Sequence, residues 1–177
     1  MVPSNIIKKL STIGRPKYYY NGTPALTFPI PKNILLFYAD KASELGKEIG
    51  HHQRFVFVAN LGTKGNAIVD QTVHLFYPGQ AMLIFPFQFH HFTNVASEGI
   101  KWVFITFELE DGNYFIKLKD RLVNLSEEFL SLLYQIITDY PLTMDNSEKT
   151  NHVIMSTGIM LNSLASSAKL PLETDKD

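Results

Sequence analysis

The residues most able to do chemistry are four histidines in two adjacent pairs, His51-His52 and His90-His91. Neutral imidazole is a common ligand for Zn, Fe, Cu and Ni. Both pairs stand where strands are expected to begin, so one barrel mouth could gather them. Consecutive strand residues point to opposite faces, however, and at most one histidine of each pair can face the interior. Two ligands fall short of the three that a catalytic metal normally takes. We therefore favour rim histidines that hydrogen-bond to backbone or ligand, with no metal, no cofactor and no catalytic residue.

Arg54 stands among apolar β-forming residues, and on a strand its side chain shares a face with His52. An arginine in such a setting is rarely buried without a partner. Two alternatives stay open: Arg54 pairs with a carboxylate of the fold, or it meets an anionic or hydroxyl-rich ligand. With Trp102 as an aromatic stacking surface, the second alternative predicts a pocket for a sugar or a small acid.

The elements that would position these residues are short strands at regular spacing. Aromatic residues suit a pleated sheet, and the chain has 13 Phe and 8 Tyr. Pro78-Gly79 is a turn pair, and Pro86 ends the apolar run before the second histidine pair. We expect strands over 34–38, 54–59, 67–70, 73–76, 81–85 and 100–108, with another opening on His90-His91. This pattern is typical of an all-β sandwich or barrel.

After about Asp120 the apolar period changes from two to 3.6, which predicts two helices. The first can be capped by Asn124 or Ser126 and is stopped by Pro141. The second runs from 145–147 to about Ser167, and Gly158 within it suits the close approach of another helix. The apolar stripes comprise Leu125, Phe129, Leu132, Leu133, Ile136, Ile137 and Tyr140, then Val153, Ile154, Met160, Leu161, Leu164 and Ala165.

Composition narrows the classes of function. The chain of 177 residues has a net charge of −1, so it lacks the basic footprint of a nucleic-acid-binding surface. It has no Cys, which excludes disulfides and thiolate chemistry. No apolar run approaches the ~20 residues of a membrane span, and the first residues do not resemble a secretion signal. We expect a soluble cytoplasmic protein with no membrane partner.

Several motifs follow one another along the β region. They are Arg54 opening a strand, Val69-Asp70, Leu75-x-x-Pro78-Gly79-Gln80, Leu83-Ile84-Phe85-Pro86 with His90-His91-Phe92, and Trp102-x-Phe104-x-x-Phe107. From about Gly46 to Phe107 the chain thereby resembles a cupin. In the residues and order of these motifs, the chain resembles the N-terminal ligand-binding and dimerisation domain of AraC-type transcriptional regulators. Those regulators also carry a helical segment after the barrel.

The resemblance to cupins also bears on whether the barrel holds a metal ion. In the two cupin metal motifs, His52 and His91 stand at ligand positions. Arg54 replaces a second histidine of the motif, and Val58 or Ala59 stands where the glutamate belongs. Half of the expected ligand set is therefore missing, which agrees with a sensor that needs no metal.

The resemblance implies a mainly β chain, with a cupin-like (double-stranded β-helix, or jelly-roll) barrel followed by a helical hairpin. We expect an arm over 1–31, the sensor barrel over 32–119, a helical dimerisation segment over 120–170 and a tail or linker over 171–177. A small metabolite effector would contact His52, Arg54, His91 and Trp102. The predicted homodimer interface comprises Phe129, Leu132, Leu133, Ile136, Met160, Leu161 and Leu164.

The resemblance implies no enzymatic activity, and DNA would be bound only through a C-terminal helix-turn-helix domain that residues 1–177 do not contain. We therefore expect the sensor half of a longer regulator, with a stand-alone relative as the other option. One alternative function is a metal-dependent cupin enzyme, either an isomerase or a dioxygenase. Another is a scaffold that only dimerises, with a barrel packed solid.

Overall fold

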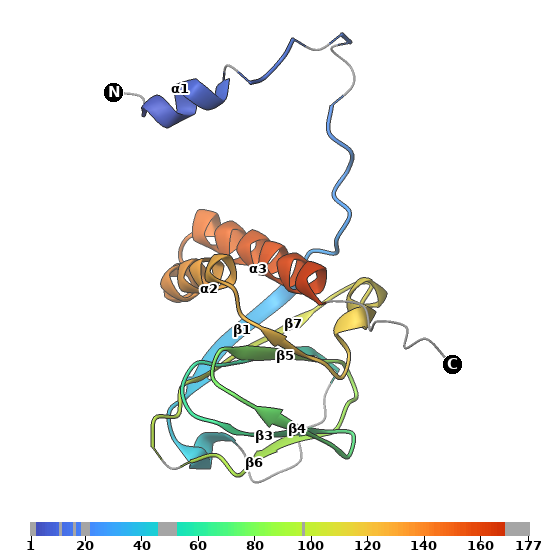
Figure 1. Ribbon diagram of the computed structural model, residues 1–177, viewed down its shortest axis with the longest axis vertical. Coiled ribbons are helices and arrows are strands. Elements are labelled where there is room, and N and C mark those ends of the chain that lie inside the picture. Colours follow the sequence, from blue (N-terminus) through green and yellow to red (C-terminus); the bar gives the residue numbers. More distant parts are fainter. Residues whose placement is uncertain are drawn as a thin grey trace, which may run out of the picture.

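Two antiparallel sheets, one of five strands and one of three, face each other in the fold. The computed structural model describes residues 3–10, 12–15, 17–18, 22–45, 53–96 and 98–168. Within them the strand orders are β1-β7-β2-β5-β8 and β4-β3-β6. Figure 1 shows the two sheets as layers, with helices α2 and α3 outside the larger one.

The described chain contains eight strands and three α-helices. The strands are β1 (Lys32–Ala39), β2 (Phe55–Asn60), β3 (Gly65–Val69), β4 (Thr72–Phe76), β5 (Gln80–Ile84), β6 (His90–Thr93), β7 (Trp102–Glu108) and β8 (Leu122–Asn124). The helices are α1 (Ser4–Leu10), α2 (Glu127–Asp139) and α3 (Ser147–Ser167), with 3-10 turns at Ala42–Leu45, Asn113–Leu118 and Tyr140–Leu142. Every strand expected from the sequence is present, with ends shifted by one or two residues.

The large sheet has apolar side chains on both faces, because it lies between the helices and the small sheet. All six residues of β2 are buried. Phe57 and Ile105 point toward the helices, whereas Val58 and Phe104 point toward the small sheet. Alternation along the strands thus divides the core into an outer layer and a barrel interior.

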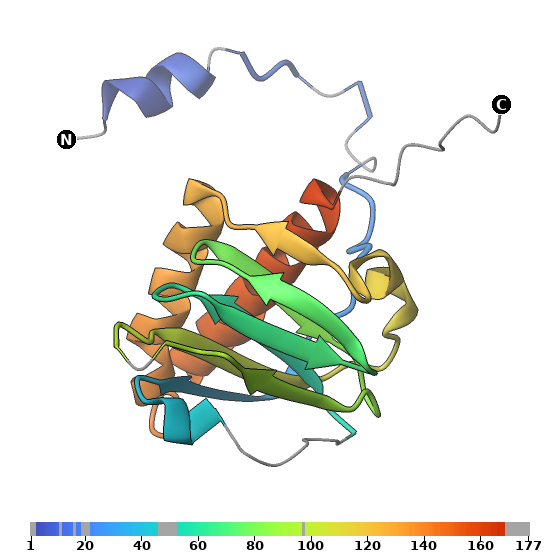
Figure 2. The same cartoon turned by 60° about the horizontal axis from the view of Figure 1, so that its bottom comes forward.

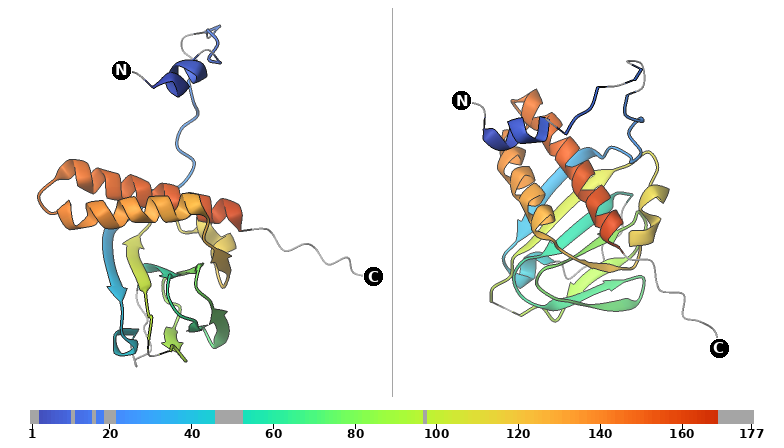
Figure 3. Two further views of the ribbon diagram at one scale, coloured as in Figure 1. Left: turned by 60° about the vertical axis from the view of Figure 1, so that its left-hand side comes forward. Right: turned by 45° about the horizontal axis from the view of Figure 1, so that its top comes forward.

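The helical hairpin begins and ends at the expected signals. Ser126 caps α2 by accepting a hydrogen bond from the Phe129 amide, and Glu127 follows at the positive end of the helix dipole. The helix ends at Asp139, and Pro141 lies in the 3-10 turn that follows. Figure 3 shows both helices lying across the large sheet on the side away from the small one.

Three features differ from the sequence-based expectations. Strand β8 lies inside the segment expected to be helical, where it pairs with β5 as the edge of the large sheet. Helix α1 lies in the arm expected to be irregular, and none of its residues is buried. The close neighbour of Gly158 is this arm and not a helix, because an added Cβ would lie 3.0 Å from the Phe28 ring.

Candidate ligand site in the barrel

A chain of contacting aromatic rings crosses the barrel interior. Phe37 of β1 stacks on Phe104 of β7 with ring centroids 5.0 Å apart. Phe92 of β6 makes T-shaped contacts with both Phe104 and Trp102, with ring centroids 5.6 and 5.2 Å apart. Trp102 in turn contacts Phe76 of β4 at 4.9 Å. The rings therefore connect the two sheets from an outer margin to the centre of the core.

This aromatic chain is exposed at one end only. The Phe37 side chain is 45 % exposed, whereas Phe104, Trp102 and Phe76 are buried. Leu35 lies on the same inner face of β1, opposite Thr106 in the register, and is also exposed. Figure 2 shows the small sheet in front of the large one, with β1 along one margin and β8 along the other. The inner face of the large sheet is thus exposed to solvent at its β1 margin.

Of the two partners considered for Arg54, the structure shows the first, a carboxylate of the fold. Its guanidinium donates to Glu108 Oε1 at 3.0 Å, to the Thr106 side chain and carbonyl at 3.2 and 3.1 Å, and to the Asn33 carbonyl. Asn33 also donates to Glu108 Oε1, at 2.7 Å. Asn33 has a backbone φ of 50° and lies at the register shift in β1. Arg54 therefore clamps β1 to β7 beside the exposed end of the aromatic chain.

His91, which we expected to contact an effector inside the barrel, does not face the barrel interior. His91 is opposite Ile68, on the outer face of the small sheet, in a shallow cleft with Asp70, Gln71 and Phe89. The other member of the pair, His90, is opposite the buried Val69, and its Nδ1 lies 3.1 Å from the Gln88 carbonyl oxygen. One histidine of the pair does face inward, but a register set by tertiary pairing decides which one.

Trp102 is another residue predicted to contact the effector. Trp102 is fully buried, and its indole nitrogen donates to the Thr63 carbonyl at 3.3 Å. Gly65 makes room for it, because an added Cβ there would lie 3.0 Å from the indole ring. Trp102 can therefore report on the interior, although no part of its ring is accessible. His52 lies outside the described residues.

His74 and Phe37 lie on the inner faces of their strands, and the sequence did not indicate either residue. His74 is opposite Ala67 and shares the inner face of β4 with Phe76. Its Nε2 is buried and has no hydrogen-bond partner within the described chain. A buried polar atom without a partner costs about 1–3 kcal/mol. The apolar residues Val73 and Leu75 point outward, so the usual pattern of apolar-in and polar-out is reversed in β4 and conceals His74.

In the described part of the chain, no group of three or more His, Asp or Glu side chains is placed to hold a metal ion. Within that part, no helix combines the length and the apolar character that crossing a bilayer requires.

The residues predicted to form a dimer interface pack inside the protomer instead. Phe129, Leu133 and Ile136 of α2 are buried against the large sheet, as are Met160, Leu161 and Leu164 of α3, and Leu132 is partly buried there. The stripe is apolar because it covers the sheet. A different stripe on α2, formed by Leu130, Tyr134 and Ile137, is exposed, with Tyr134 at 72 %.

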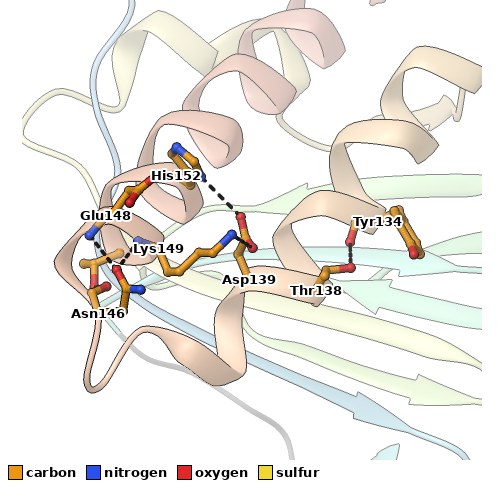
Figure 4. A network of polar contacts seen from close by, with 8 residues as sticks. Tyr134, Thr138, Asp139, Asn146, Glu148, Lys149 and His152 are labelled. Atoms are coloured by element: carbon orange, nitrogen blue, oxygen red, sulfur yellow. Dashed lines mark hydrogen bonds and ion pairs between the residues drawn. The ribbon is translucent and has the colours of Figure 1, made fainter.

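A polar network joins the end of α2 to the start of α3 (Figure 4). Asp139 at the end of α2 accepts a hydrogen bond from Lys149 Nζ at 2.7 Å and lies 3.5 Å from His152 Nδ1. The hydrogen bond from Lys149 lowers the pKa of the Asp139 carboxyl below its ordinary value. Asn146 caps α3 by accepting from the Glu148 and Lys149 amides. In the same view the Tyr134 ring points away from this network.

Sequence comparison assigns no family. No protein-family model matches the chain, and no curated protein matches it either.

Solved structures with similar architecture do exist. The apo form of a ToxT variant from Vibrio cholerae matches with a TM-score of 0.51 and 11 % identity, over 84 % of this chain and 58 % of ToxT. The fold is a cupin-like barrel followed by a helical hairpin. A cupin protein from Bacteroides fragilis (TM-score 0.37, 16 % identity, 57 % of this chain and 82 % of that one) is also similar. So is a cupin 2 conserved barrel domain protein from Rhodopseudomonas palustris (0.34, 14 %, 64 % and 81 %). The chain thus spans little more than half the length of ToxT.

Replacing Arg54 tests whether it is a clamp. Arg54→Ala removes the hydrogen bonds to Thr106, Glu108 and Asn33, so we expect it to lower the free energy of unfolding by roughly 1–3 kcal/mol. Urea denaturation measures this. Lys32→Ala is the matched control, since it breaks a solvent-exposed ion pair with Glu110 and should have little effect. An Arg54→Ala protein as stable as wild type would contradict the clamp and return Arg54 to the ligand.

The Asp139 network predicts a pH-dependent contribution to stability. Because the folded-state pKa of Asp139 is lowered, the contribution is present above the ordinary aspartate pKa of about 4 and is lost as the pH falls through the lowered value. We expect Asp139→Asn to lower Tm by roughly 1–3 °C at pH 7 and by progressively less toward pH 3. Thermal melts across this range check it, with Glu98→Gln, an exposed loop carboxylate, as the control. A pH-independent difference would contradict the role of the charge.

Proposed function

We propose that this chain is the effector-sensing and dimerisation domain of an AraC-type transcriptional regulator. In this role the barrel binds a small metabolite, and the helical hairpin joins two copies. DNA would be bound by a further domain outside residues 1–177.

The observation that carries this proposal is the order of a cupin-like barrel and a helical hairpin in one unit. ToxT is an AraC-family regulator, and the match to it covers 84 % of the chain. The barrel strands span only residues 32–124, so a match of that extent reaches beyond the barrel. The motif order from Arg54 to Phe107 supports the same assignment independently of the fold.

The proposed ligand path begins at the β1 margin. Exposed Phe37 and Leu35 offer apolar contact there, and Thr106 offers a hydroxyl group on the same inner face. The aromatic chain leads from Phe37 inward to Trp102. Aromatic walls with a few polar groups are the usual lining of small-molecule sites.

The proposed dimer surface is the exposed stripe Leu130, Tyr134 and Ile137, in place of the buried stripe expected from the sequence. These three residues recur at helical spacing on α2. An exposed apolar stripe of this kind favours association.

Ligand binding can be followed through the single tryptophan. We expect at least one compound in a panel of sugars, hydroxy acids and simple carboxylic acids to raise Tm and change Trp102 fluorescence, because Trp102 lies at the inner part of the aromatic chain. Phe37→Ala should weaken that response at least tenfold in apparent Kd. Tyr38→Ala alters the adjacent residue, which is 64 % exposed on the opposite face, and should leave it unchanged. A wild-type protein indifferent to the whole panel would count against effector sensing.

Dimerisation is tested by placing a charge in the exposed stripe. Tyr134→Glu should convert a dimer into a monomer, because it desolvates a carboxylate at an apolar contact. Light scattering coupled to size-exclusion chromatography measures the mass. Gln135→Glu adds the same charge at an exposed neighbouring position on another side of α2 and should leave the dimer intact. A wild-type monomer at high concentration, or a dimeric Tyr134→Glu protein, would overturn this surface.

A further inference from the structure

The inner face of the small sheet carries a polar residue that the fold does not satisfy. One row across this face runs from His74 on β4 through Ala67 on β3 to Phe92 on β6. Ala67 is small and fully buried, so the imidazole and the Phe92 ring flank it toward the interior. His74 Nε2 is buried there without a hydrogen-bond partner in the described chain.

Other buried polar side chains in the same barrel are fully accommodated. Asn60 donates to the Thr63 and Phe76 carbonyls at 2.8 and 3.0 Å and accepts from the Gly62 amide at 3.0 Å. Buried Gln88 donates to Asp70 and Asp120, each at 2.8 Å, and accepts from the Phe85 amide. His74 is therefore an exception within a well-satisfied interior, and an exception of this kind calls for a specific explanation.

His74 lies near a margin of the barrel, on an edge strand. Strand β4 is the edge of the small sheet and β8 is the edge of the large one. The two edges face each other, since Gln88 joins Asp70 before β4 to Asp120 before β8. Leu122 of β8 packs against the interior core on this side. A group bound between these edges in place of the Leu122 side chain would approach Nε2.

We propose that His74 anchors the effector by a hydrogen bond between its Nε2 and a hydroxyl group of the bound molecule. This inference rests on the proposed sensing function and adds a ligand class to it. A neutral imidazole nitrogen is a donor in one tautomer and an acceptor in the other. A hydroxyl group both donates and accepts, so it satisfies either tautomer. Binding thereby removes the cost of the orphaned atom, which an apolar ligand of the same shape cannot do.

The experiment compares His74→Leu with wild type, alone and with defined probes. Leucine has no polar atom to leave unsatisfied, so we expect the unliganded variant to melt roughly 2–4 °C higher than wild type. The probes are D-xylose, D-ribose, D-glucose, D-galactose, lactate and citrate, together with benzoate and hexanoate, which lack hydroxyl groups. A probe that stabilises wild type should lose at least tenfold in apparent Kd with His74→Leu, and its deoxy analogue should bind wild type weakly.

His91→Leu is the matched control, because His91 is on the outer face of the same sheet; it should respond to probes as wild type does. Equal responses of His74→Leu and wild type overturn the role of His74 and leave the sensing function standing. Stabilisation of wild type by benzoate or hexanoate alone also leaves sensing standing and overturns the hydroxyl class. An unliganded His74→Leu protein that melts below wild type shows that Nε2 is satisfied in solution and contradicts the inference. Indifference of wild type to every probe counts against sensing and anchoring together.

Discussion

The fold depends on burying both faces of the five-stranded sheet. Strand β2 is buried along its whole length, and such a strand is stable only when each face has its own cover. The helices cover one face and the small sheet covers the other. The helical hairpin is therefore part of the protomer's core, and its most apolar stripe is already occupied. Any association between copies through the helices has to use what remains exposed on their outer surface.

The barrel interior combines rigid aromatic packing with a few polar positions, and the contrast between those positions is informative. Asn60 and Gln88 have partners for their amide groups, so they stabilise turns between strands. Arg54 does similar work at the rim through Glu108 and Asn33. Among the residues that the structure describes, His74 Nε2 has no such partner. Arg54, which looks functional in the sequence, thus has a structural role, whereas the inconspicuous His74 is the residue that we propose to meet a ligand.

Each margin of the barrel combines a stabilising polar contact with a residue of the proposed ligand site. The Arg54 clamp ties β1 to β7 beside the exposed Phe37 ring, so the entrance at this margin has a fixed wall. The opposite margin, between β4 and β8, is held by Gln88 and its two aspartates. A ligand spanning from Phe37 toward His74 would contact both sheets. Its binding would couple the small sheet to the large sheet on which the helices pack, which is a physical route from barrel to dimer surface.

Local patterns in the sequence were enough to determine the architecture. The period-2 runs, the Pro-Gly turn and the change to a 3.6 period predicted an all-β sandwich or barrel, seven of its eight described strands and helices α2 and α3, and Ser126 and Pro141 marked the bounds of α2. These signals are local because backbone conformation follows propensity and turn chemistry. Which face of a strand points inward was decided only by the tertiary pairing, since a shift of one residue exchanges the faces. That pairing placed His90 inside and His91 outside, and turned His74 inward while apolar Val73 and Leu75 faced solvent. The apolar residues of α2 and α3 likewise pack against the large sheet of the same protomer. An apolar stripe in the sequence shows that one face of a helix is covered, but it does not show which surface covers it.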